Sequence, residues 1–318
     1  MAPLSRTGRS SGRGARPVVT RFELPVAPPF RLDLTVHALR RVPSNVVDVL
    51  TASGDYLHAF AAAKGPGIVR VAQPRPEALA VTITRRVRNA ADDRRVLALL
   101  RRTLGIDRDL TAFYAAASRL RWLAPLARRM RGIKPPRYRS LWEACVNSIV
   151  FQQVSLHAAT AVVRRLVTTF GASVAGVDEP LYVFPEVGRV LRASDAELRA
   201  LGLSAAKVAT LRRIGETIAA GTLSEAMIEA RPSNEAAELL CTVKGIGPWT
   251  ASVILLRGFG RLDVFPGNDS GVARSFALVA GDGATAVDDV VGALAPQQGM
   301  LYFHLLLARL ESRGDIGR

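Results

Sequence analysis

Cysteine and histidine are scarce in this chain of 318 residues, which has two cysteines and four histidines. Cys145 and Cys241 are too few to hold an iron–sulfur cluster, and the scattered histidines complete no familiar zinc motif. Both cysteines lie in apolar helical patterns, so we expect two reduced thiols in a reducing compartment. The sequence therefore predicts that no cofactor is required.

Long apolar runs and acidic residues are also in short supply. No apolar run reaches the ~18–20 residues that a membrane-spanning helix needs, so we expect no membrane partner. Lys and Arg number 43 against 27 Asp and Glu, which gives a formal net charge of +16. This excess predicts a polyanionic partner, nucleic acid before anionic lipid, unless it reflects an Arg-rich composition alone. We expect a cytoplasmic, nucleoid-associated monomer.

The first 90 residues divide into two parts. Residues 1–18 are rich in Arg and Ser without acids, which favours a disordered basic arm over the transit peptide that such a composition also resembles. Residues 19–90 contain runs of alternating apolar and polar residues that predict half-buried strands. These runs lie at 32–36, 68–71 and 79–83, and a short helix is expected at 44–50. The pattern predicts a small antiparallel sheet domain.

Residues 91–318 show helical spacing of apolar residues, with Gly and Pro between the segments. The predicted helices are 92–104, 107–120, 121–131, 139–152, 156–170, 186–192, 195–201, 204–221, 223–231, 234–242, 248–258, 269–281, 285–294 and 299–312. The expected fold class is therefore α+β, a small sheet domain followed by a mostly helical core.

A glycine hairpin at 243–248 is the most distinctive local motif. Its glycines permit positive φ and close backbone approach, and Pro248 suits the first turn of the next helix, whose free N–H groups favour a DNA phosphate. The predicted phosphate contacts are Lys244, Gly245, Ile246, Gly247 and Thr250. The carbonyls proposed for a structural Na⁺ or K⁺ are those of Cys241, Val243 and Ile246. The alternative is a helix-capping turn that binds nothing.

A carboxylate follows the hairpin in the loop 263–269. Asp269 comes after a Pro-Gly turn at the start of another helical pattern, where the helix dipole stabilises a negative charge. Its alternative role is a simple helix N-cap. Asp263 precedes an apolar anchor and is expected to tie down the loop. We therefore predict that Asp269 is the catalytic carboxylate.

The segments GIGPWTA and DVFPGND together resemble the helix–hairpin–helix, Gly/Pro…Asp superfamily of DNA glycosylases, in particular its 3-methyladenine DNA glycosylase II branch. The resemblance covers roughly residues 130–312, including SLWEA, VFQQVS and GLSAAK. It implies a two-lobed helical core that flips a damaged base out of double-stranded DNA. On the matched positions Asp269 falls on the catalytic aspartate, and Gln153 with Gln152 falls on the wedge that fills the gap.

Trp249 stands where strand-cutting relatives keep a lysine that forms a Schiff base. The resemblance therefore implies a monofunctional glycosylase without lyase activity, with Trp249 as a wall for the flipped base. Trp142 and Tyr138 are further pocket candidates, each with a core role as its alternative. The expected substrates are alkylated purines, such as 3-methyladenine and 7-methylguanine, with etheno or deaminated bases as an extension. The alternative functions are a non-catalytic DNA-binding protein and a glycosylase with another lesion range.

Overall fold

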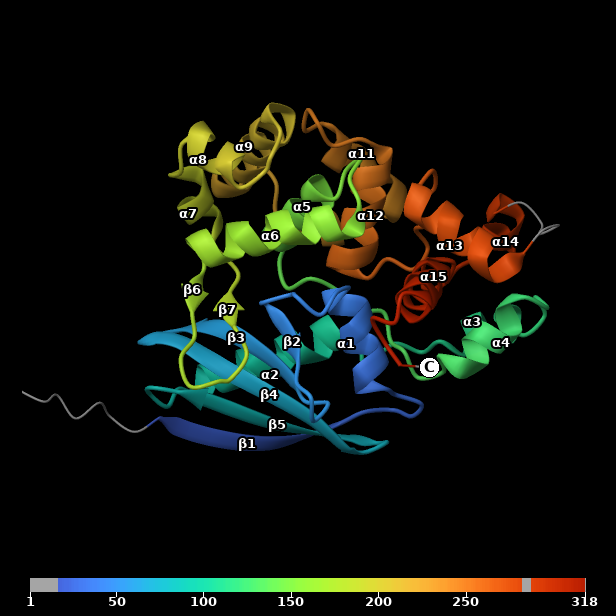
Figure 1. The fold of residues 1–318 in the computed structure, drawn as a ribbon, viewed down its shortest axis with the longest axis horizontal. Helices are drawn as coiled ribbons and strands as arrows, with labels where there is room; N and C mark the ends of the chain where they lie inside the picture. The colour runs from blue at the N-terminus through green and yellow to red at the C-terminus, as the bar shows by residue number, and fades with distance from the viewer. Residues whose placement is uncertain (1–16, 282–286, 318) are drawn as a thin grey trace, which may run out of the picture.

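The computed structural model describes residues 17–281 and 287–317 and has a sheet at its N-terminal side and helices over the rest (Figure 1). The predicted α+β class is confirmed. The predicted basic arm, residues 1–18, lies outside the described residues except for its last two positions.

Within the described residues, five strands form one antiparallel sheet in the order β1-β5-β4-β3-β2. The strands are β1 Val18–Pro25, β2 Asp48–Leu50, β3 Tyr56–Ala62, β4 Gly65–Arg75 and β5 Ala78–Arg85. Alternate residues of β5 are buried: Leu79, Val81 and Ile83 face the core. They pair with the same face of β4, where Val71 lies opposite Val81. The strands predicted at 68–71 and 79–83 are confirmed.

Two predictions in the N-terminal region are wrong. Residues 32–36 are not a strand but the start of the helix α1 Leu32–Arg40. The prediction failed because α1 is buried on two sides, so its apolar residues follow one another as they do in a strand. Residues 44–50 are a turn followed by β2, not a helix. The Asn45 side chain accepts hydrogen bonds from the backbone N–H groups of Val47 and Asp48, which fixes a turn in place of a helix.

All the helices predicted beyond residue 91 are present within the described residues, with ends shifted by a few positions. They are α2 Ala90–Leu104, α3 Thr111–Ala117, α4 Leu123–Arg129, α5 Leu141–Val150, α6 Leu156–Phe170, α7 Val187–Leu191, α8 Asp195–Ala200, α9 Ala205–Ala219, α10 Glu225–Glu229, α11 Ser233–Cys241, α12 Pro248–Phe259, α13 Ser270–Ala280, α14 Val287–Ala293 and α15 Gly299–Ser312. A short strand pair, β6 Ala172–Ser173 with β7 Tyr182–Val183, was not predicted. No described helix is both long and apolar enough to span a bilayer.

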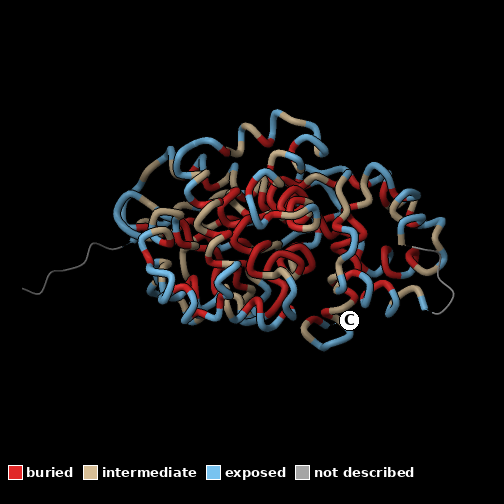
Figure 2. Tube along the Cα trace, turned by 90° about the horizontal axis from the view of Figure 1, so that it is seen from above, coloured by how far each residue is buried: buried red, intermediate tan, exposed pale blue. Residues whose placement is uncertain are grey.

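Two large apolar clusters and two small ones form the interior of the described part of the chain, which Figure 2 shows as the red segments inside an exposed shell. The first runs without interruption from the sheet into α5, α9, α11 and α12, so the sheet shares its core with the helices. The second joins α3, α4, α13 and α15. Helix α1 packs between β2, β3 and α15 (Figure 1). The residue after it, Arg41, lies over the ring of Phe151, which packs against both large clusters.

Candidate active site

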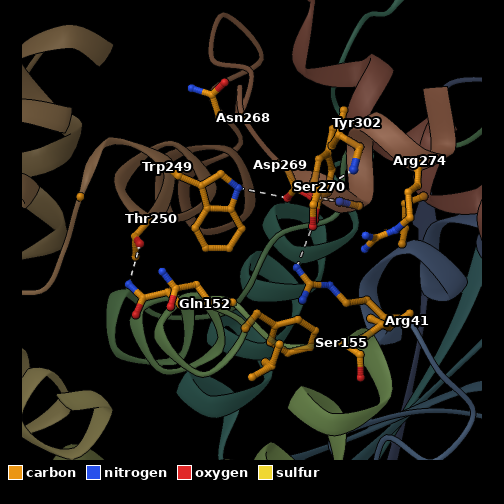
Figure 3. Close-up of a pocket in the computed structure, with 18 of the residues that line it drawn as sticks. Arg41, Gln152, Ser155, Trp249, Thr250, Asn268, Asp269, Ser270, Arg274 and Tyr302 are labelled. Atoms are coloured by element: carbon orange, nitrogen blue, oxygen red, sulfur yellow. Dashed lines mark hydrogen bonds between the residues drawn. The ribbon is translucent and has the colours of Figure 1, made fainter. Parts of the chain in front are cut away.

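A cavity of about 990 Å³ lies between the glycine hairpin, the turn joining α5 to α6, the start of α13 and one side of α15 (Figure 3). Asp269, Trp249 and Gln153 line it together with Tyr302 and Arg41. Residues far apart in the chain thus converge on one space, which lies within the 300–1,000 Å³ common for small-molecule sites.

Asp269 caps helix α13 and lines the cavity at once. One carboxylate oxygen, Oδ1, accepts the N–H of Gly271 (2.6 Å) and of Val272 (3.0 Å). The other oxygen, Oδ2, accepts the indole N–H of Trp249 (3.0 Å), as Figure 3 shows. These three donors hold the carboxylate in a fixed orientation. The N-cap alternative and the site prediction therefore describe the same carboxylate.

The first glycine of the hairpin cannot be replaced by another residue unless a neighbouring side chain moves. Gly245 has φ +102°, and a Cβ built there would lie 2.1 Å from Oγ1 of Thr210. Gly247, the N-cap of α12, has φ −98° and open space around it. Since Gly247 offers no side-chain cap, the first N–H groups of α12 can bind an anion at this open end.

The predicted phosphate contacts differ in exposure. Lys244 and Gly245 are exposed, whereas the side chains of Ile246 and Thr250 are buried. Thr250 can contribute through its backbone N–H in the first turn of α12, but the N–H of Ile246 is already bound within the hairpin. In the predicted cation site, the carbonyl of Val243 accepts the Ile246 N–H (2.9 Å). A carbonyl oxygen has two lone pairs, so this bond leaves one free. The cation and its predicted ligands, the carbonyls of Cys241, Val243 and Ile246, stay a prediction.

The two glutamines of the predicted wedge have different surroundings. Gln152 donates from Nε2 to Oγ1 of Thr250 (2.8 Å) and to the carbonyl of Gly245 (3.1 Å), so it braces the turn against the hairpin and is not free to enter DNA. Gln153 is exposed at the tip with φ +54°, and its role as a wedge stays a prediction. The neighbouring Val154 is 45% exposed, an apolar tip residue that the sequence analysis missed.

The structure does not bring Trp142 or Tyr138 to the cavity. Trp142 is buried in α5, where its indole N–H donates to the carbonyl of Pro185 (3.0 Å). Tyr138 is buried under the guanidinium of Arg257, which lies 5.0 Å from its ring centre. Their core role is therefore the correct one, and the aromatic wall consists of Trp249 with two residues not chosen from the sequence, Phe151 and Tyr302.

Residues 146–290 match the family model described as HhH-GPD superfamily base excision DNA repair protein. This HhH-GPD match covers a little under half of the chain and includes both the hairpin and Asp269.

Curated relatives of this chain include DNA-3-methyladenine glycosylase of Bacillus subtilis, 29% identical over 55% of this chain and 57% of the relative. DNA-3-methyladenine glycosylase 2 of Escherichia coli is 30% identical over 46% of this chain and 50% of the relative. The chain thus spans about half the length of these relatives.

Solved structures share the fold over most of both chains. The 3-methyladenine DNA-glycosylase from Archaeoglobus fulgidus superposes with a TM-score of 0.74 at 22% identity, covering 91% of this chain and 98% of that one. A DNA-bound 8-oxoguanine glycosylase/lyase from Clostridium acetobutylicum gives 0.67 at 17% identity, covering 90% and 93%. Because the same fold occurs in a protein named as a glycosylase and in one named as a glycosylase/lyase, the fold alone does not identify the reaction. The side chains that line the cavity must do so.

Four basic residues line the cavity but were not among the site residues predicted from the sequence. They are Arg41, Lys207, Arg274 and Arg309. Lys207 donates from Nζ to the carbonyl of Val150 (2.9 Å) and holds the end of α5 before the wedge turn. Burial lowers the pKa of Lys207. The turn GLSAAK marked Lys207 in the sequence, whereas the three arginines were hidden among many others.

Proposed function

We propose that this protein is a monofunctional DNA glycosylase that removes alkylated purines from double-stranded DNA. The observation that carries the proposal is the carboxylate of Asp269, held by three N–H donors at the wall of a nucleoside-sized cavity beside an open helix N-terminus. The names of the curated relatives in Bacillus subtilis and Escherichia coli point to the same substrates.

Binding begins with the phosphate backbone. The exposed Lys244, the hairpin and the free N–H groups of α12 are suited to one DNA phosphate and read no sequence. The damaged nucleotide then leaves the stack at a cost of a few kcal/mol, which contacts with the cavity wall offset. Gln153 at the exposed tip is placed to occupy the gap in the duplex.

Bond cleavage follows from charge. A purine alkylated at a ring nitrogen is already cationic, so it leaves with the electron pair of the glycosidic bond while positive charge grows on the sugar. Asp269 stabilises that oxocarbenium ion electrostatically. Its Oδ2 accepts one hydrogen bond whereas Oδ1 accepts two, so Oδ2 has more lone-pair capacity to face the sugar or orient the attacking water.

Strand cleavage by a Schiff base is disfavoured by the side chains at hand. Trp249 occupies the place of the lyase lysine, and its N–H is bound to Asp269. Lys207 does line the cavity, but its ammonium group donates to the carbonyl of Val150 at the end of α5. Base removal therefore leaves an intact strand with an abasic site.

The test uses duplex DNA treated with a methylating agent, incubated with the wild type and with Asp269→Asn, followed by chromatography of released bases. We expect free 3-methyladenine and 7-methylguanine from the wild type alone. A wild type that binds the duplex and releases nothing would make the protein a DNA-binding module. Borohydride trapping tests the lyase function: a covalent adduct with DNA would contradict the monofunctional assignment.

A further inference from the structure

Arg41 brings a buried positive charge into the cavity from the N-terminal part of the chain. It follows α1 directly, with φ +66°, and its side chain is 6% exposed. Its Nη2 donates to the hydroxyl of Tyr302 (3.2 Å), and its guanidinium lies 4.1 Å from the ring centre of Phe151. Figure 3 shows Arg41 reaching from below towards Tyr302 and the start of α13.

The guanidinium of Arg41 is incompletely satisfied. Among the described residues it forms no ion pair within 4 Å, although the charge of Asp269 on the same cavity acts on it, and its buried Nε has no hydrogen-bond acceptor. A desolvated cation in this condition costs free energy. Arg257 is buried more deeply, and its Nε and Nη1 also lack acceptors, but it does not line this cavity. Its Nη2 donates to the carbonyls of Ala38 and Leu39 at the end of α1, which is a structural role. Arg41 forms no such bond to a helix end.

We propose that Arg41 reads the flipped base and favours purines with an oxygen at position 6. A guanidinium has donors and no acceptor. It therefore binds the O6 of 7-methylguanine or hypoxanthine and meets a like donor in the 6-amino group of 3-methyladenine. Arginine distinguishes guanine from adenine in the DNA major groove by the same chemistry. This selectivity rests on the proposed base-removing function of the cavity.

Charge alone does not produce this preference. 7-Methylguanine and 3-methyladenine are both cationic, so repulsion by Arg41 acts on both. The group at position 6 remains as the difference that a donor can sense. A good contact of this kind discriminates about tenfold or more between bases.

The experiment scores both bases in one reaction. Duplex DNA treated with a methylating agent is incubated with the wild type, Arg41→Met and Arg41→Lys, and the initial rates of 7-methylguanine and 3-methyladenine release are compared. We expect the ratio of the two rates to fall about tenfold or more in Arg41→Met. Arg41→Lys, which keeps the charge but not the planar donor fork, should give an intermediate ratio.

Arg274→Met is the matched control, because Arg274 is an exposed arginine on the same cavity. A contact with the DNA backbone would change both rates by the same factor and leave the ratio constant. The same result in Arg41→Met, with both rates lowered together, would overturn the proposal.

A second measurement separates this proposal from the proposed function. Thermal stabilisation by free hypoxanthine and free adenine needs no catalysis. We expect hypoxanthine to stabilise the wild type more than adenine does, and Arg41→Met to lose that difference. Equal stabilisation of the wild type by both bases would contradict base reading by Arg41. If the preference is present but no base is released from DNA, the reading of the base stands and the glycosylase assignment fails.

Discussion

Arg139 and Arg41 are both buried arginines near the junction of the sheet and the helices, but their partners differ. Arg139 donates to both carboxylate oxygens of Asp48 (2.7 and 3.2 Å) and to Glu143 (2.7 Å). Arg41 contacts a hydroxyl and an aromatic ring. Arg139 is paired with carboxylates that join β2 to α5, whereas Arg41 has no carboxylate in hydrogen-bond contact and lines the cavity with Asp269. Partners, more than burial, separate structural from functional groups here.

The Arg139 network also decides which of its acids carries charge. One guanidinium can neutralise only one of the two carboxylates. The charged form of Asp48 is the better stabilised of the two, because the hydroxyl of Tyr56 also donates a hydrogen bond to it (2.7 Å). Burial raises the pKa of Asp48, but Arg139 more than offsets this, so the value lies below its usual range. Burial, with repulsion from Asp48, raises the pKa of Glu143 to about 7 in spite of Arg139.

The largest expected effect tests the two arginines directly. Arg139→Met leaves two buried carboxylates without their counterion and should lower the free energy of unfolding by about 3–5 kcal/mol. Arg41→Met removes an incompletely satisfied cation and should cost less than about 1 kcal/mol. Urea denaturation of both variants gives the comparison. Equal losses would show that Arg41 is a structural residue as well.

The hairpin glycines extend the comparison to the backbone. Gly245→Ala forces a Cβ against Thr210 at a positive φ and should cost about 1–3 kcal/mol of stability. Gly247→Ala meets open space, so its stability loss should be below about 1 kcal/mol while the new methyl group obstructs a phosphate and weakens DNA binding. Thermal melts and duplex-binding titrations measure the two effects. Unchanged DNA affinity in Gly247→Ala would argue against phosphate binding there.

Two tryptophans make a third matched pair. Trp249→Phe removes the N–H that holds Oδ2 of Asp269, so base release should slow about tenfold with little change in Tm. Trp142→Phe leaves the buried carbonyl of Pro185 without its donor, so Tm should fall while the rate stays near that of the wild type. Single-turnover rates and melting curves show whether the two effects separate as expected. A slow Trp142→Phe with normal Tm would return Trp142 to the active site.

The smallest effect concerns pH. The raised pKa of Glu143 means that the folded state binds more protons than the unfolded state between about pH 4.5 and 7, so stability falls as pH rises through this window. Glu143→Gln cannot titrate. The Tm of the wild type relative to Glu143→Gln should therefore decline by about 2–4 °C from pH 5 to 8. His58, whose pKa burial lowers to about 3, acts in the opposite direction but is present in both proteins. A Tm difference between the two proteins that does not change with pH would contradict the raised pKa of Glu143.

The sequence was informative wherever a local pattern carried the chemistry. Asp269 follows a Pro-Gly turn at a helix start, and Gly245 marks a hairpin, so both could be placed from neighbours alone. The helices beyond residue 91 were predictable because apolar spacing and caps such as Ser194 are local signals.

Tertiary contacts explain what the sequence could not show. Arg41 enters the cavity because α1 packs between the sheet and α15, more than 200 residues away in the chain, and one arginine among many gave no sign of it. The same double packing of α1 produced the alternation that was mistaken for a strand. Trp142 looked like a pocket residue because aromatic type does not reveal which face of a buried helix it occupies.

The effect of Asp269→Asn on catalysis and on binding tests the central claim most directly. Asparagine is also a good N-cap, so α13 should keep its start while the negative charge is lost. We predict that the single-turnover rate of 7-methylguanine release falls more than a hundredfold, which corresponds to an activation free energy higher by about 3 kcal/mol. The Kd for duplex DNA should stay within about threefold of the wild-type value. A release rate within tenfold of the wild type would contradict the role of Asp269 as the group that stabilises the departing charge.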